Sequence, residues 1–238
     1  MENFSFEILW ALLTLTLMEI VLGIDNIVFV SIVSSKTHAH KKNFTRNVGI
    51  ILALILRLGL LFTVSWIMGL QAPWIKIFSM SLSGRDMILM LGGLFLIYKA
   101  TMEIHEKIED APMGIKKIKE VYSVPSAIFQ ILMLDLVFSL DSVITAVGMV
   151  KEIWIMVVAM VVAMFVMLFS AKSISDFVEN NPTIKILALA FLLLIGVLLL
   201  MEGLGQKMDK GYIYFAMAFS LAIELINMRI RNQKNKAK

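Results

Sequence analysis

Four acidic side chains interrupt stretches of this sequence that are otherwise apolar. Glu19 and Asp25 lie in one such stretch, and Asp135 and Asp141 lie in a later one. A charged side chain at the centre of a bilayer costs at least about 2.5–3.5 kcal/mol on insertion scales, so it generally serves a function. Carboxylates in such surroundings mark ion pathways or proton relays. These acids therefore predict a route for a cation or a proton.

The two pairs of acids have the same spacing and the same kinds of neighbours. A shift of 116 residues aligns acid with acid twice, Gly23 with Ser139, and Asn26 with Ser142. The aligned segments are MEIVLGIDNIV at 18–28 and LDLVFSLDSVI at 134–144. Such a register of rare acidic residues predicts an internal repeat.

The spacing within each pair constrains how the acids can act together. Six residues of a regular helix turn through about 600°, which leaves the two acids roughly 120° apart. Residues seven apart do share a face, as Glu19 does with Asn26 and Asp135 with Ser142. Either each helix is broken between its acids, or the acids serve different partners. The points where breaks are expected are Gly23 and Ser139.

Carboxylates, an amide and a hydroxyl are hard oxygen donors, which suit magnesium, calcium or manganese. The predicted metal ligands are Asp25, Asp141, Asn26, Asp135, Glu19 and Ser142. Asp25 and Asp141 are the expected primary ligands. Weaker candidates for the ion path are Glu224, Arg57, Glu103 and Glu202. Arg57 is the one deeply placed base, and the alternative is that the acids pair with bases only to join helices. Arg57 could neutralise one or two acids but not four.

The overall composition indicates a membrane protein. Of 238 residues, 59% are hydrophobic and 17% are charged, and the mean hydropathy is +0.86. Soluble domains average about 45–50% apolar and about 25% charged residues. The absence of cysteine excludes Cys-ligated zinc, iron–sulfur clusters and a catalytic thiol. No Walker A sequence is present, so ATP use is not expected.

Seven stretches are long and apolar enough to cross a bilayer, which takes about 20 residues. They are 7–34, 48–70, 85–102, 125–149, 153–171, 184–202 and 211–228. The prediction is an all-α polytopic protein with one transmembrane domain over 1–238. The repeat groups the first three spans as 7–102 and the next three as 125–202. Because three is odd, the copies cross the membrane in opposite directions, as in inverted-repeat transporters. The stretch 211–228 is an additional seventh helix.

The basic residues predict the orientation of the chain. Fifteen Lys and Arg residues flank one side of the spans and five flank the other. The positive-inside rule then puts the N-terminus outside and the C-terminus in the cytoplasm. This bias also explains the net charge of +4 without nucleic-acid binding.

The acidic segments resemble a known family. EIVLGIDN at 19–26 and DLVFSLDS at 135–142 are similar to the two signature segments of the TerC family, with supporting matches in YKATMEIH at 98–105 and GYIYFAMAFS at 211–220. The resemblance covers essentially the whole chain. It implies a seven-span, multi-pass protein of the bacterial inner membrane within the lysine-exporter superfamily. Family members are named for tellurium resistance, and several are implicated in manganese export. The matched positions at which the resemblance implies a role in ion passage are Asp25, Asn26, Asp135 and Asp141.

The expected function is export of a divalent cation, Mn²⁺ above all, from a site between spans one and four. Mn²⁺ is the expected substrate and membrane lipid the expected surrounding. No cofactor and no nucleic-acid partner are expected. Expelling two charges from a cell at 100 mV costs about 4.6 kcal/mol, so proton antiport is the expected driver. Rocking of one three-span unit against the other would expose the site alternately.

Two alternatives stay open. One is an intramembrane aspartyl enzyme whose two aspartates share a proton, although the Gly-x-Gly-Asp context of such enzymes is missing here. The other is a transporter or resistance factor for a different ion. The sequence does not determine the oligomeric state or the coupling stoichiometry.

Overall fold

The computed structural model describes residues 2–63, 73–77, 80–109, 121–150, 152–206 and 209–236. Within this part of the chain, seven helices are long and apolar enough to cross a membrane. They are α1 (Glu2–Ser35), α2 (Lys42–Phe62), α4 (Gly84–Glu109), α5 (Val124–Met149), α6 (Ile153–Asn180), α7 (Pro182–Gly203) and α8 (Lys210–Lys236). An antiparallel hairpin of β1 (Pro73–Ile77) and β2 (Met80–Ser83) precedes α4.

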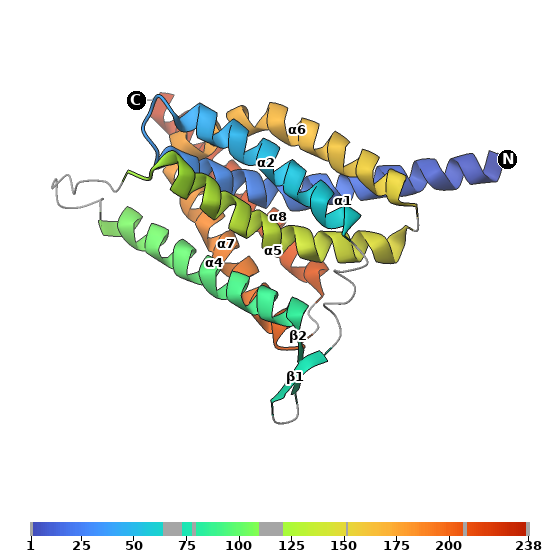
Figure 1. Ribbon diagram of the computed structural model, residues 1–238. Helices are drawn as coiled ribbons and strands as arrows, with labels where there is room; N and C mark the ends of the chain where they lie inside the picture. Colours follow the sequence, from blue (N-terminus) through green and yellow to red (C-terminus); the bar gives the residue numbers. More distant parts are fainter. Residues whose placement is uncertain are drawn as a thin grey trace.

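The helices run back and forth, and the N-terminus and the C-terminus lie at opposite ends of the bundle (Figure 1). The predicted all-α fold with seven spans is confirmed. The fold does not show which end faces the cytoplasm, so the outward N-terminus stays a prediction. We call the end with the hairpin the outer end and the other the inner end, following that prediction.

Several boundaries differ from the prediction. The second span was expected at 48–70, but α2 begins at Lys42 and ends at Phe62, and residues 64–70 lie outside the described part. The fifth was expected to end at 171, whereas α6 continues to Asn180. Hydropathy detects only the apolar part of a helix, while backbone hydrogen bonding continues through polar turns beyond it. The short hairpin carries no hydropathy signal and was not predicted.

Three pairs of helices make most of the packing: α4 with α7, α1 with α6, and α2 with α5. Exchanging the triplet α1, α2, α4 for α5, α6, α7 converts the α1–α6 pair into the α5–α2 pair and leaves the α4–α7 pair unchanged. This is the pattern that a two-fold axis through the α4–α7 contact would give. The inverted repeat itself, with its boundaries 7–102 and 125–202, stays a prediction that this packing supports.

The backbones of α4 and α7 touch at two glycines. A Cβ at Gly93 would lie 2.6 Å from the Gly196 carbonyl oxygen and 2.8 Å from the Leu200 nitrogen. A Cβ at Gly196 would lie 3.0 Å from the Gly93 carbonyl oxygen and 2.9 Å from Ile97. Small residues allow this close approach between helices in membranes. The contact is reciprocal, as expected near a two-fold axis.

Neither α1 nor α5 is broken at the expected points. Both helices are continuous through Gly23 and Ser139. A side chain at Gly23 would overlap the thioether of Met167, so this glycine allows α1 to pack closely on α6. Of the two alternatives from the sequence, the structure shows unbroken helices, and the two acids of α5 have different partners.

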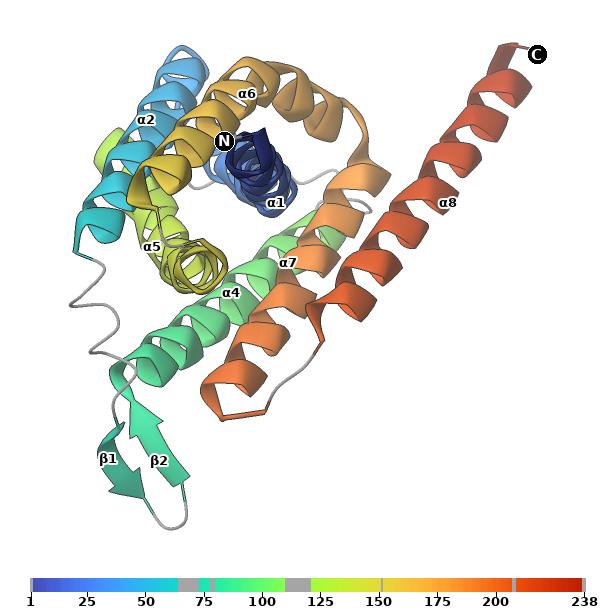
Figure 2. The same ribbon diagram turned by 90° about the vertical axis from the view of Figure 1, so that its right-hand side faces the viewer.

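The last helix, α8, stands apart from the bundle. Figure 2 shows it leaning away beside α7, with which it makes its main packing contact. Most of its side chains are exposed. Two cavities of about 360 and 370 Å³ separate α8 from the neighbouring helices.

Candidate functional site

Three helices meet at a buried arginine. Arg57 of α2 is only 2% exposed, and its Nη1 donates to Glu19 Oε2 of α1 at 2.8 Å. Its Nη2 donates to Asp135 Oδ1 of α5 at 2.7 Å, and its Nε lies 3.1 Å from the same oxygen. Glu19 and Asp135 occupy equivalent positions in the predicted repeat, so one cation bridges the two related acids.

Two neutral side chains complete this group, which we call the deep cluster (Glu19, Asn26, Arg57, Asp135 and Ser139). Ser139 Oγ donates to Asp135 Oδ2 at 3.0 Å, and Asn26 Nδ2 donates to Asp135 Oδ1 at 3.4 Å. This contact fixes the amide orientation, because a flipped amide would turn its oxygen toward the carboxylate. The other atom of the amide, Asn26 Oδ1, is buried and accepts no hydrogen bond from the described residues.

A small cavity adjoins the deep cluster. It measures about 20 Å³, and Asn26, Arg57 and Asp135 line it together with apolar side chains. A space of this size holds about one water molecule. With both carboxylates and the guanidinium ionised, the deep cluster has two negative charges and one positive charge. The remaining negative charge lies in an apolar surrounding, where an unpaired charge is costly.

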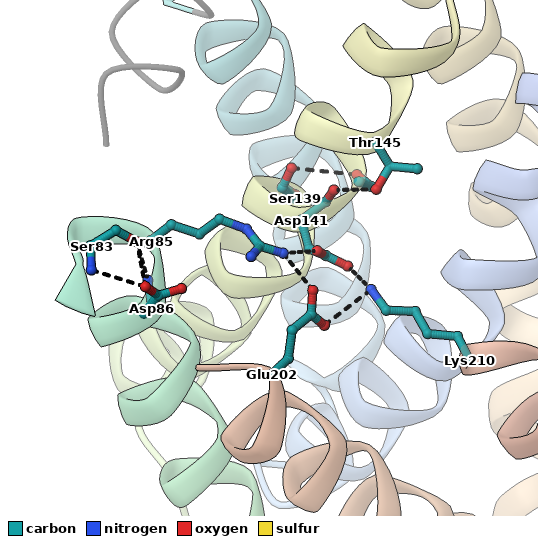
Figure 3. A network of polar contacts seen from close by, with 9 residues as sticks. Ser83, Arg85, Asp86, Ser139, Asp141, Thr145, Glu202 and Lys210 are labelled. Carbon is teal, nitrogen blue, oxygen red and sulfur yellow. Dashed lines mark hydrogen bonds and ion pairs between the residues drawn. The ribbon is translucent and has the colours of Figure 1, made fainter. Parts of the chain in front are cut away.

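A second group of charges lies nearer the outer end, and we call it the outer cluster (Arg85, Asp141, Glu202 and Lys210). Arg85 Nη2 lies 2.8 Å from Asp141 Oδ1 and 2.5 Å from Glu202 Oε1. Lys210 Nζ pairs with the same two acids, contacting Asp141 Oδ2 and lying 3.3 Å from Glu202 Oε2. Figure 3 shows the two bases reaching the acids from opposite sides. Two acids and two bases leave this cluster formally neutral.

The two clusters are separate. Asp135 and Asp141 lie six residues apart on the unbroken α5, which corresponds to a rise of about 9 Å. The outer cluster joins the first turns of α4 and α8 to the last turn of α7 and to the middle of α5.

Ion pairs also hold the inner end of the bundle. Lys36 Nζ lies 2.6 Å from Glu103 Oε1 and 2.7 Å from Glu106 Oε2, which joins the end of α1 to the end of α4. Partial burial works to lower the pKa of Lys36, but the hydrogen bonds that Lys36 donates to the two glutamates outweigh it and raise the pKa to about 12. Lys36 is therefore charged throughout the physiological range. Lys42 and Glu179 pair at 2.5 Å in the same region.

The structure distributes the predicted ligands among different surroundings. It brings Glu19, Asn26 and Asp135 together in the deep cluster and puts Asp141 in the outer cluster. Ser142 is buried on α5, where its hydroxyl donates to the Ser139 carbonyl at 3.4 Å. Asp25 falls within α1, but its side chain lies outside the part that the structure describes.

The weaker candidates also separate. Arg57 pairs with two of the acids, which is the upper limit expected from the sequence. Glu202 belongs to the outer cluster, and Glu103 is buried at the inner end. Glu224 is half-buried on α8 and forms no ion pair with the residues that the structure describes.

Two basic members of the outer cluster were not predicted. Arg85 and Lys210 lie at span ends, where the positive-inside count treats every Lys or Arg alike. Their acidic partners lie far away in the sequence, so no local spacing links them. The neighbouring glycines, Gly84 and Gly211, do not mark these two bases as members of a site either.

The acids of both clusters pair with bases here, as the helix-joining alternative requires. Among the described residues, no three His, Asp or Glu side chains converge as a metal site. The deep cluster nevertheless contains two hard carboxylates and one orphaned amide oxygen beside a cavity. This set of donors could bind a cation if Arg57 withdrew.

Comparison with known proteins identifies the family. The family described as "Integral membrane protein TerC family" matches residues 4–238. The chain belongs to the TerC family. The UPF0053 inner membrane protein YgdQ of Escherichia coli K12 is 52% identical over 225 residues, which are 94% of each chain. A UPF0053 protein of Haemophilus influenzae is 48% identical over 221 residues, or 93% of each chain.

A longer relative shares the same region. The UPF0053 inner membrane protein YoaE of Escherichia coli K12 is 46% identical over 232 residues, which are 97% of this chain but 45% of YoaE. No solved structure matches the chain significantly. With these relatives and seven helices of spanning length, this TerC protein is a multi-pass protein of the bacterial inner membrane.

Proposed function

We propose that this TerC protein exports a divalent cation, Mn²⁺ above all, across the inner membrane through the deep cluster. The observation that carries the proposal is the pairing of an excess buried negative charge with the orphaned Asn26 Oδ1 at one small cavity. A buried acceptor without a donor calls for an explanation such as a bound ion or water. A cation would satisfy both the oxygen and the charge.

The chemistry of the donors favours a hard cation. Carboxylate and carbonyl oxygens suit Mg²⁺, Ca²⁺ and Mn²⁺. Glu19, Asn26 and Asp135 would provide such oxygens from α1 and α5. The choice of Mn²⁺ among hard cations rests on the family resemblance. Asp25, the neighbour of Asn26 on α1, stays a predicted ligand, and Asp141 and Ser142 are proposed to lie along the outward route.

Arg57 has a specific part in this proposal. Its guanidinium binds the same carboxylate oxygens that a metal ion would need, so the two cations compete. Arg57 acts as a tethered counter-ion that neutralises one of the two negative charges of the cluster while the site is empty. Binding of Mn²⁺ requires Arg57 to move away from at least one acid.

Proton antiport is the proposed driving reaction. Outward movement of two positive charges opposes a potential that is negative inside. A proton can take the place of the metal ion at the excess charge of the deep cluster, because carboxylates inside membranes form the proton relays of pumps and transporters. Protons entering from outside would thus replace the metal ion that has left.

The first experiment measures cellular metals in a manganese-sensitive bacterial strain. Expression of the wild-type protein should lower cellular Mn²⁺, whereas Asp135→Asn and Asn26→Leu should not. Glu152→Gln, which changes an exposed acid before α6, is the matched control and should act as wild type. Export of Mn²⁺ is excluded if wild type leaves cellular Mn²⁺ unchanged. If the wild type instead lowered cellular Mg²⁺ or Ca²⁺ by a similar amount, the proposed substrate would be replaced and the proposed binding site would be retained.

Coupling is tested in inverted membrane vesicles that contain the wild-type protein. An imposed gradient with acid inside the vesicles should drive Mn²⁺ uptake into them, and Asp135→Asn should abolish this uptake. Uptake that does not respond to the gradient would remove the antiport component.

An intramembrane aspartyl enzyme receives no comparable support. Such an enzyme needs two carboxyl groups that share a proton. Among the described residues, Glu19 meets Asp135 through Arg57, and Asp141 meets Glu202 through Arg85 and Lys210. These acids are joined by cations, which supports ion exchange over proton-shared catalysis.

A further inference from the structure

The outer cluster has a composition that helix stability does not explain. Arg85 and Lys210 lie in the first turns of α4 and α8, and Glu202 lies in the last turn of α7. The helix dipole disfavours cations at an N-terminus and anions at a C-terminus. All three charges therefore occupy the unfavourable end of their own helix. Among the described residues, each of the three forms its ion pairs with other members of the cluster.

Close packing puts Arg85 beside Glu202. Glu202 is followed by Gly203, the last residue of α7, where a Cβ would lie 2.7 Å from the Asp86 carbonyl oxygen. The glycine thus lets the end of α7 touch the first turn of α4. This contact makes the Arg85 side of the cluster part of the rigid α4–α7 pair.

The Lys210 side is attached differently. Lys210 begins α8, the helix that packs mainly on α7 and is otherwise exposed. Together with Asp141, Lys210 lines the cavity of about 370 Å³ between α8, α5 and α1. The α1 wall of that cavity comes from Leu17, Met18, Val21 and Leu22, the neighbours of Glu19 along the helix. Lys210 and its partner Asp141 therefore both border this cavity.

We propose that Lys210, held between Asp141 and Glu202, closes the outer route to the deep cluster, and that its release opens this route. The inference rests on the proposed transport function and names the residue that controls access from the outside. Lys210 is the mobile partner because α8 is only loosely packed, while Arg85 is the fixed partner. A leaving cation would meet Asp141 about 9 Å along α5 from Asp135, and it would have to displace Lys210 from Asp141 and Glu202 there.

The natural absence of cysteine makes a direct test possible. Ser142→Cys introduces one thiol at a position on α5 that is 4% exposed and adjacent to Asp141. A membrane-impermeant maleimide is added to intact cells without Mn²⁺, and the labelling rate is compared among backgrounds. The backgrounds are wild type, Lys210→Met, Lys210→Arg, Glu202→Gln and Arg229→Met, the last removing an exposed charge from the other end of α8.

Lys210→Met and Glu202→Gln should each raise the rate on the order of tenfold, the factor given by a shift of about 1.4 kcal/mol in the opening equilibrium. Lys210→Arg, which keeps the charge, should stay close to wild type, and Arg229→Met should not change the rate. A separate Glu152→Cys protein, labelled at an exposed outer position, should react equally in every background and reports correct insertion.

Three results would contradict the proposal that Lys210 is a gate. The first is an unchanged rate in both Lys210→Met and Glu202→Gln. The second is an equal increase in Arg229→Met, which would indicate general loosening. The third is an increase in Lys210→Arg as large as in Lys210→Met. Labelling needs no transported ion, so the two proposals can fail separately. If the labelling rates change as expected while expression of the wild type leaves cellular Mn²⁺ unchanged, only the proposed function is refuted. Export with unchanged labelling would refute only the gate.

Discussion

At the scale of single residues, Arg57 determines the electrostatics of the membrane interior. It pairs with two acids from two different helices at once, and it is buried almost completely. Breaking a buried ion pair by removing one partner leaves an uncompensated charge and costs about 3–5 kcal/mol. Replacing all the charged partners by apolar residues is often neutral.

This difference gives a prediction for stability. Arg57→Met should lower the free energy of unfolding by about 3–5 kcal/mol, measured by thermal unfolding of the purified protein in detergent. The triple variant with Arg57→Met, Glu19→Leu and Asp135→Leu should regain most of this loss while remaining unable to export Mn²⁺. A triple variant less stable than Arg57→Met would show that the acids have other stabilising partners.

At the scale of elements, the α4–α7 pair forms the most closely packed part of the fold. Gly93 and Gly196 contact backbone atoms of the opposite helix, and backbone cannot rearrange as a side chain can. The outer cluster depends on this pair, because α7 provides Glu202 and α4 provides Arg85.

A glycine-to-alanine substitution should affect stability differently at this helix crossing and at a helix glycine that has open space around it. Gly93→Ala should destabilise the protein by about 1–3 kcal/mol through overpacking. Gly59→Ala is the matched control in α2, where the added Cβ would meet nothing within 4 Å, and it should be neutral or stabilising by up to about 1 kcal/mol. Both changes are measured by thermal unfolding in detergent. Equal effects of the two substitutions would mean that the α4–α7 backbones are not in contact.

At the scale of the whole molecule, the chain has two chemically different ends. The inner end carries most of the basic residues that the sequence places between spans. We therefore expect a reporter enzyme active only in the periplasm to work when fused before residue 1, and one active only in the cytoplasm to work when fused after residue 238. The reverse pattern would invert the membrane orientation and exchange the outer and inner sides of both clusters.

How much the sequence could predict depended on how local each signal was. Seven helices follow from long apolar runs, and the acids of α1 and α5 stand out because charges inside such runs are rare. Arg57 was detectable for the same reason. The outer cluster was not, because Arg85 and Lys210 look like ordinary flanking bases and meet Asp141 only through the packing of four helices. The sequence also could not show that Asp135 and Asp141 belong to different clusters, because this depends on α5 being unbroken between them.

The bridge between Glu19 and Asp135 has a consequence for energetics. The two acids are equivalent in the predicted repeat, but the base between them comes from α2 alone. Its counterpart helix, α6, has one basic residue, the exposed Lys172. If the two triplets exchange conformations during transport, the arginine travels with one half only. The two end states are then unequal in free energy, and an unloaded protein rests preferentially on one side of its cycle.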